Sequence, residues 1–320
     1  MTPVRGSERL AALRLAPDGL PRPDAPFGRG PLAARALRAT IEVAAAGGSR
    51  LPARVAHGLA DLGGTAEWAL RPRKRRILAE NLAHATGLPP SHPDVRALVR
   101  REVVNEARRS VDLLWALGKP EELVRTTAVE GREHVLEALE RGNGLIVVSA
   151  HIGGWEVATA MPRVIIPVPT TAIVTDDCLA WAVAGLRARV GLGLLYDTEP
   201  VSRAASLLRA GEALLVLGDY AKDSMRTYPV RLLDAVAELP AGVATLARLC
   251  GSPVVPFTVL PLAPRRWRVE IEPALDPPPR RGGPEAEREL LQALADRWTA
   301  QLRANAEHWA AVYRMTWRHA

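Results

Sequence analysis

The sequence has few of the residues that build metal centres or disulfide scaffolds. Two cysteines in 320 residues, Cys178 and Cys250, are too few for a disulfide framework and have no metal-ligand spacing. The seven histidines are scattered, with no HExxH or paired-ligand pattern. No GxSxG elbow offers a serine nucleophile. These absences favour chemistry without a metal or a serine nucleophile.

Long hydrophobic runs are absent as well. No apolar stretch reaches the roughly eighteen residues of a membrane span, and no signal peptide begins the chain. We therefore expect a protein of the cytoplasm, which can still lie on a membrane surface.

Positive charge exceeds negative charge, for a formal net charge of +7, and arginine supplies most of it. This balance favours an anionic partner: a phospholipid surface, an acyl carrier, a phosphorylated cofactor or nucleic acid. An arginine-rich proteome would give the same bias without any partner. Signatures of nucleic-acid binding, such as zinc fingers or a ribonucleoprotein aromatic motif, are missing, so we expect no nucleic acid.

The N-terminal part is helical in pattern. Residues 1–30 are rich in Pro, Gly and Arg and are expected to form a flexible tail. Residues 31–70 predict two or three amphipathic helices, followed by a basic cluster from Arg71 to Arg76, and helices are expected to continue through residues 94–140. Two interpretations stay open: a helical layer packed on a sheet, or a peripheral element that docks on lipid phosphates.

The remaining sequence alternates short β-branched runs with helical stretches. Strands are expected at 144–149, 164–174, 213–217 and 253–260, with a more exposed strand in RRWRVEIEPAL; helices are expected at 177–190, 201–210, 241–250 and 285–310. This alternation predicts an α/β fold, a central mainly parallel sheet flanked by helices, with an N-terminal helical layer. We expect residues 31–320 to form a single domain whose amphipathic helices occupy about 31–140.

One strand end carries a candidate general base. The stretch SAHIGGWEVA places His151 just past Ser149, where the carboxyl end of a parallel strand gathers functional groups. Glu156 follows five residues later, and the two side chains can meet only if the chain turns at Gly153-Gly154. A carboxylate beside the imidazole would stabilise an imidazolium. The alternative is a structural histidine that caps the following helix.

Two further segments offer polar groups. In ALLVLGDYAKDSMRTYPVRLLD, a strand ends at Asp219, and the loop after it carries Lys222 and Arg226; Asp219 could face the same sheet edge as His151 or could cap a turn. Glu238 precedes a helix that could line an acyl-chain tunnel or pack in the core.

The ordered set of these segments resembles the lysophospholipid acyltransferase superfamily. HVLEALERGNGLIVVSAHIGGWEVA is similar to the HxxxxD/E motif of the branch that contains lipid A late acyltransferases and phosphatidylinositol mannoside acyltransferases, with Trp155 at the usual aromatic position. RRILAENL, LRARVGLGLL, LVLGDYAKDS and LPAGVATLARLCGSPVVP resemble other blocks of that branch, and the likeness spans residues 70–318.

The resemblance implies a glycerolipid-acyltransferase-like fold and transfer of a fatty acyl group from acyl-CoA or acyl carrier protein to a hydroxyl of a membrane glycolipid or lysophospholipid. His151 would be the base and Glu156 would orient it, without metal or cofactor. Arg187 or Arg226 would bind phosphate. Where the family often has Phe-Phe-Gly and an acid, this chain has Leu232-Leu233-Asp234-Ala235. A second catalytic carboxylate could therefore be Asp219, Asp234 or Glu238.

These inferences place the protein peripherally on the cytoplasmic face of the cell membrane, with an anionic lipid surface as partner. Two rival functions remain. A non-catalytic protein could bind anionic lipid or nucleic acid through its basic helices, with His151 purely structural. A thioesterase-like hydrolase could use the same base on water.

Overall fold

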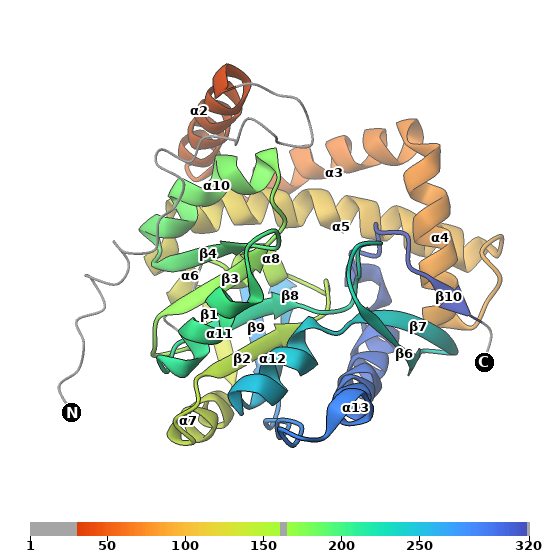
Figure 1. The fold of residues 1–320 in the computed structure, drawn as a ribbon. Coiled ribbons are helices and arrows are strands. Elements are labelled where there is room, and N and C mark those ends of the chain that lie inside the picture. The colour runs from red at the N-terminus through yellow and green to blue at the C-terminus, as the bar shows by residue number, and fades with distance from the viewer. Residues whose placement is uncertain (1–30, 161–164, 319–320) are drawn as a thin grey trace.

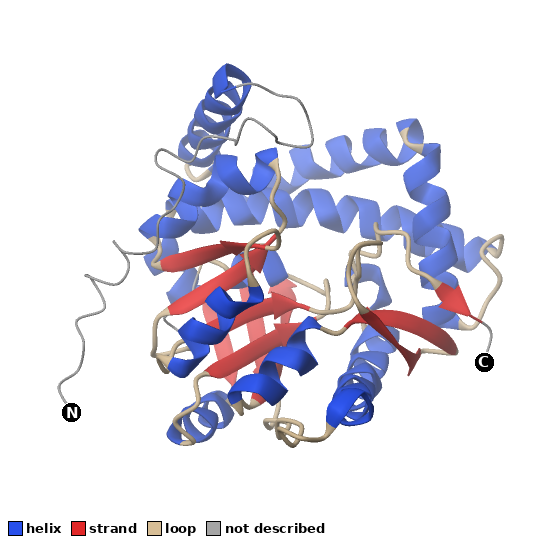
Figure 2. Ribbon diagram, viewed as in Figure 1, coloured by secondary structure: helices blue, strands red, loops and turns tan. Residues whose placement is uncertain are grey.

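The computed structural model describes residues 31–160 and 165–318, and its centre is a seven-stranded sheet with helices on both faces (Figures 1 and 2). The strand order is β1-β9-β8-β2-β5-β3-β4. Neighbouring strands from β8 to β4 run parallel. β9 runs antiparallel to β8, and β1 pairs in parallel with β9. The expected α/β fold with a mainly parallel sheet is confirmed. The tail expected over residues 1–30 lies outside the described residues.

The strands of this sheet are β1 (Thr127–Glu130), β2 (Leu145–Ser149), β3 (Thr170–Val174), β4 (Leu192–Tyr196), β5 (Ala213–Leu217), β8 (Val254–Ala263) and β9 (Arg266–Ile271). A second, three-stranded sheet combines β6 (Thr227–Leu232), β7 (Ala235–Pro240) and β10 (Trp317–Arg318) in the order β10-β7-β6. β2 and β4 are buried along their whole length, as expected for parallel strands covered on both faces.

The helices are α2 (Pro31–Gly48), α3 (Ala53–Leu70), α4 (Pro72–Thr86), α5 (Pro93–Gly118), α6 (Pro120–Thr126), α7 (Arg132–Glu140), α8 (Trp155–Ala158), α10 (Cys178–Arg189), α11 (Val201–Arg209), α12 (Gly242–Cys250) and α13 (Gly283–Ala304), with the 3-10 turn η2 (Ala306–His308). In Figure 1, α2 to α5 gather along one side of the sheet, at the top of the view. This is the N-terminal helical region that the sequence predicts.

Small residues let α3 approach α5 closely. The buried residues of α3 are Ala56, Ala60 and Gly64, and a Cβ on Gly64 would lie 2.8 Å from the Cα of Val104. Because the packed face of α3 is made of small residues, its large apolar side chains point elsewhere. Leu59 and Leu62 are 57% and 71% exposed.

Several elements differ from the sequence-based expectation. Residues 127–130, expected to be helical, form β1, and β4, β6 and β7 were not expected as strands at all. The strand expected at 164–174 begins only at Thr170, because Pro167 and Pro169 lack the N–H that a ladder needs; residue 164 lies outside the description. The helix expected at 285–310 ends at Ala304, and the chain then turns back toward β2.

Candidate active site

The register between β2 and β5 brings His151 and Asp219 together. These strands are parallel neighbours, and Ser149 pairs with Leu217 at their carboxyl ends. His151 and Asp219 each follow two residues later. Nδ1 of His151 lies 2.6 Å from Oδ1 of Asp219, and the backbone N–H of His151 donates to Oδ2 at 3.1 Å. Both residues are buried.

The chain after His151 turns sharply at its two glycines. Gly153 has φ of 63°, and a Cβ there would overlap the carbonyl oxygen of Val259 in β8. The N–H of Gly154 donates to this same oxygen at 2.6 Å. Only glycine fits this close approach of backbone to backbone. Gly154 is also the N-cap of α8 and no side chain caps that helix, so the helix-capping interpretation of His151 is wrong.

The electrostatics of the pair decide where its proton lies. Burial alone would raise the pKa of Asp219, but the charge and hydrogen bonds of His151, with a further bond from Trp309, hold that pKa below its ordinary value. An ionised Asp219 can only accept, so Nδ1 of His151 carries the shared proton. Nε2 then has the free lone pair, and His151 can take a proton from a bound hydroxyl or water.

Glu156 does not make the contact that the sequence predicted. The orienting position at Nδ1 of His151 is occupied by Asp219, and Oε2 of Glu156 is buried without a hydrogen-bond partner in the described structure. Glu156 lies in the first turn of α8, whereas Asp219 reaches His151 from the segment after β5. Burial raises the pKa of Glu156, against the charges of Arg109, Arg187 and His151. Glu156 is therefore a neighbour of the imidazole rather than its orienting partner.

Two buried arginines surround Glu156. Arg187 in α10 is 9% exposed and Arg109 in α5 is 3% exposed. Burial lowers the pKa of Arg187, while Glu156 is the first of the groups that raise it. The Nε of Arg187 and the Nε and Nη1 of Arg109 have no hydrogen-bond partner in the described structure. These guanidinium groups therefore keep free donors near Glu156. Arg109 was not singled out from the sequence, because nothing distinguishes it from its many neighbouring arginines.

Aromatic rings enclose the imidazole. The ring of Trp155 meets His151 edge-on, with centroids 5.0 Å apart, and Tyr313 approaches it at 5.2 Å. Tyr313 stacks in turn on Tyr220 at 4.3 Å. Partial burial first, and then the carboxylates of Asp219 and Glu156, raise the pKa of Tyr313 to about 12, so its hydroxyl stays protonated. Trp155 and Tyr313 thus contact the imidazole directly, and the substrate-binding role expected of Trp155 stays a prediction.

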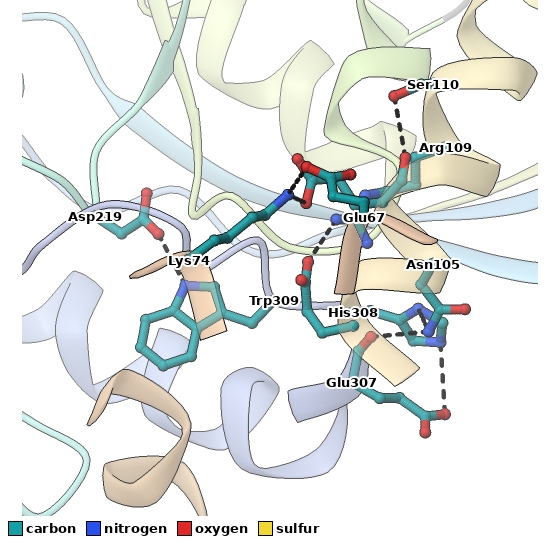
Figure 3. A network of polar contacts seen from close by, with 11 residues as sticks. Glu67, Lys74, Asn105, Arg109, Ser110, Asp219, Glu307, His308 and Trp309 are labelled. Atoms are coloured by element: carbon teal, nitrogen blue, oxygen red, sulfur yellow. Dashed lines mark hydrogen bonds and ion pairs between the residues drawn. The ribbon is translucent and has the colours of Figure 1, made fainter. Parts of the chain in front are cut away.

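The C-terminal segment completes the site and was not anticipated as part of it. Trp309 donates from Nε1 to Oδ2 of Asp219 at 3.1 Å (Figure 3). The backbone N–H of Ala310 donates to the carbonyl of His151 at 2.7 Å, and Gly153 donates to the carbonyl of His308 at 2.8 Å. The sequence offers only a cluster of tryptophans as a signal, since these contacts join residues that are 90 or more positions apart.

The other candidate residues lie elsewhere. Arg226 donates to Glu287 and Thr245, each at 2.6 Å, and forms an ion pair with the buried carboxylate of Glu287. The phosphate-binding role expected of Arg226 stays a prediction. Glu238, in β7, accepts from Thr227 and pairs with Arg318. Asp234 bonds Nδ1 of His84 at 2.6 Å. Of the three carboxylates considered, Asp219 is the one on His151. Lys222 pairs with Asp197.

No group of three or more His, Cys, Asp or Glu side chains among residues 31–160 and 165–318 is arranged to hold a metal ion. None of the helices in these ranges is both long and apolar enough to cross a bilayer.

The fold and the site define an α/β enzyme with a buried histidine–carboxylate pair at the carboxyl ends of two parallel strands. The family described as bacterial lipid A biosynthesis acyltransferase matches residues 43–318, and the chain belongs to this family. The protein is therefore an acyltransferase of lipid substrates, and the resemblance seen in its sequence is confirmed.

A search of solved structures finds the 1-acyl-sn-glycerophosphate (LPA) acyltransferase PlsC from Thermotoga maritima, at 13% identity and a TM-score of 0.35, covering 78% of this chain and 98% of that one. No curated protein matches the sequence.

Proposed function

We propose that the protein transfers a fatty acyl group from a thioester, acyl-CoA or acyl carrier protein, to a hydroxyl of a membrane glycolipid or lysophospholipid. The observation that carries this proposal is the buried His151–Asp219 pair, with Nδ1 bound at 2.6 Å and Nε2 left for a substrate proton. The family supplies the acyl chemistry and the lipid class.

The proposed reaction needs one base and no covalent enzyme intermediate. Nε2 of His151 takes the proton of the acceptor hydroxyl while the oxygen attacks the thioester carbonyl carbon. The tetrahedral intermediate collapses, the C–S bond breaks, and the leaving thiolate receives the proton from Nε2. Asp219 stabilises the imidazolium formed between these steps and keeps Nδ1 protonated throughout.

Arg187 is the proposed anion-binding group. It is buried, its Nε has no partner in the described structure, and its charge acts on Glu156 beside His151. A guanidinium with free donors in a low-dielectric site suits a phosphate of the donor or the acceptor. We propose that Glu156 supports the site through Arg187, because the position beside Nδ1 is already occupied.

The outer face of α3 is the proposed membrane contact. Val55, Leu59, Leu62 and Leu70 are 49%, 57%, 71% and 79% exposed, at a spacing that places them along one side of the helix. Arginines flank this stripe at exposed positions: Arg50, Arg54, Arg71, Arg73 and Arg76. An apolar stripe bordered by cations suits a bilayer with anionic headgroups, so the protein would bind peripherally, on the cytoplasmic face.

Lipid mass spectrometry with and without the gene would test the function and identify the acceptor. We expect a membrane glycolipid or phospholipid to lose one acyl chain when the gene is deleted. With purified protein and an acyl thioester, that deacylated lipid should gain the chain. If the protein hydrolyses the thioester at the same rate with and without the lipid, and no acyl chain reaches the lipid, a hydrolase is favoured. Salt-sensitive DNA binding without acyl transfer would favour a binding protein.

A further inference from the structure

A segment between η2 and β10 forms a strap across the active site. After η2 the chain runs back along the β2–α8 turn, where Trp309 pairs with Ile152 as an isolated antiparallel bridge. We call residues 308–313 the C-terminal strap. Asn105 of α5 holds its start by donating to the carbonyl of Glu307 at 2.8 Å (Figure 3). Its far end is fixed by Asn81 of α4, which donates to the carbonyls of Ala311 and Tyr313, both at 2.8 Å.

One side chain of the strap reaches the carboxylate that binds His151. Trp309 is 1% exposed, and its indole N–H points at Oδ2 of Asp219, as Figure 3 shows. Oδ2 also accepts the backbone N–H of His151 at 3.1 Å, while Oδ1 faces Nδ1. Two donors on Oδ2 fix the rotation of the carboxyl plane. With only one donor there, the carboxylate could rotate and lengthen its bond to Nδ1.

We propose that Trp309 is a positioning residue for acyl transfer, acting on His151 through Asp219. Its N–H holds Oδ2 so that Oδ1 stays aligned with Nδ1, and it withdraws part of the charge that the carboxylate would otherwise direct at the imidazole. This inference rests on the proposed function, in which His151 is the base. The strap therefore contributes Trp309 to a hydrogen-bonded series of three side chains, in which Trp309 binds Asp219 and Asp219 binds His151.

Trp309→Phe tests the role, because it keeps an aromatic ring and removes the N–H. We expect kcat to fall about 10-fold or more, in the range found for lost supporting contacts, while KM for the acyl thioester changes little. The acid limb of the pH profile, which reports the coupled His151–Asp219 pair, should move to higher pH. The reason is that Asp219, with one donor fewer, holds the imidazolium more strongly.

Trp298→Phe is the matched control. Trp298 is 2% exposed and lies against the residue that precedes Asp219, since a Cβ on Gly218 would come within 2.9 Å of its ring. Its Nε1 has no hydrogen-bond partner in the described structure. This variant removes an indole N–H from the same neighbourhood, but that N–H makes no hydrogen bond. The kcat and pH profile of the variant should therefore match the wild type.

The outcomes separate this inference from the function on which it rests. If Trp309→Phe keeps the wild-type kcat and pH profile, as Trp298→Phe should, the positioning role is refuted while the function stands. If a folded His151→Ala protein is fully active, His151 is not the base, and the part of the proposed function on which this inference rests fails.

If Trp309→Phe does not fold, ¹⁵N-indole NMR replaces it. The spectra are recorded on Trp155→Phe protein, so that the indole in edge-on contact with His151 does not contribute. The chemical shift of one indole N–H, that of Trp309, should change with pH at the midpoint of the acid limb. In His151→Ala this change should be absent. Indole resonances that all stay fixed with pH would overturn the proposal.

Discussion

Nδ1 of His151 lies 2.6 Å from Oδ1 of Asp219, although 68 residues separate them in the sequence. The two meet because each follows the end of its strand by two residues, and because Ser149 and Leu217 pair at those ends. The adjacency of β2 and β5 in the sheet thus creates the pair. A shift of one residue in either segment would turn its side chain to the other face of the sheet.

The first prediction compares the two carboxylates near His151. Asp219→Asn should lower kcat by about 10²- to 10⁴-fold, because an amide donating to Nδ1 would favour the wrong tautomer. Glu156→Gln should cost less, since Glu156 makes no described hydrogen bond to the imidazole. Single-turnover acyl transfer on folded protein measures both. A larger loss in Glu156→Gln than in Asp219→Asn would restore the sequence-based role of Glu156 and remove that of Asp219.

The comparison of these carboxylates shows what local sequence can predict. LIVVS and ALLVL are short apolar runs that predict buried strands, and each is followed at the same distance by a polar group. His151 and Asp219 were therefore placed at one edge of the sheet. The sequence does not show the strand order, so it could not establish that β2 and β5 are neighbours. Glu156 was preferred because it is close in sequence, but Asp219 is close in space.

The less accurate expectations have physical causes. β1 has only four residues, and β4, with the sequence LGLLY, contains a glycine and no β-branched residue, so neither segment has both the usual length and the usual composition of a strand. The strap has no periodic pattern, and its place depends on contacts to residues far along the chain. Trp309 binds Asp219, 90 residues away, and Asn81 binds Tyr313, 232 residues away. Such contacts follow from the tertiary fold and leave no local trace.

The second prediction concerns the anchor of the strap. Asn81 is 2% exposed, donates to the carbonyls of Ala311 and Tyr313, and accepts from Nε1 of Trp317 at 2.8 Å. Asn81→Ala should lower the free energy of unfolding by about 2–4 kcal/mol, because it removes these bonds and leaves buried groups unpaired. Urea unfolding measures the loss.

Trp317→Phe, which breaks only the bond to the end of the chain, is the comparison for Asn81→Ala. It should cost less and leave the strap resistant to limited proteolysis, whereas Asn81→Ala should expose the strap to cleavage. Equal stability and equal cleavage in the two variants would show that Asn81 does not anchor the strap.

The third prediction concerns pH and a buried carboxyl group in α5. Glu102 is fully buried; burial raises its pKa to about 7, against the attraction of Arg109 at 2.8 Å. The folded state thus holds a proton that the unfolded chain loses above its ordinary pKa of 4.5. Stability from this group is complete below about pH 4.5 and is lost as pH rises toward about 7. The free energy of unfolding of the wild type should therefore decrease across this pH window, and in Glu102→Gln that decrease should be absent.

Glu287 provides the opposite case for that measurement. It is 1% exposed, but hydrogen bonds from Arg248, Tyr228 and other donors outweigh burial and lower its pKa. Glu287→Gln should lose most stability near neutral pH, and the difference from the wild type should shrink as pH falls. Chemical unfolding at several pH values distinguishes the two. Equal pH dependence for the wild type and Glu102→Gln would contradict the raised pKa of Glu102.

The fourth prediction tests the outer face of α3. Changing Leu59 and Leu62 together to Gln should weaken binding to vesicles that contain anionic lipid, since both side chains are more than half exposed and do not support the core. Binding of the wild type should also weaken as salt rises. Co-sedimentation measures both effects.

The matched control changes Leu136 and Val201 to Gln. These residues are 43% and 59% exposed, on α7 and α11, away from α3. The control should bind vesicles like the wild type. If both double variants bind equally well, or if neutral vesicles bind as well as anionic ones, α3 is not an electrostatically assisted membrane contact.

The fifth prediction concerns the base itself, and the most direct measurement is acyl transfer by His151→Ala, with folding followed on the same preparation. The imidazole is 11% exposed and its Nδ1 bond to Asp219 is the main polar contact that alanine removes. We expect a folded protein whose single-turnover rate falls by on the order of 10²-fold or more, the usual contribution of a general base. Full turnover per folded His151→Ala molecule would contradict the catalytic role of the His151–Asp219 pair.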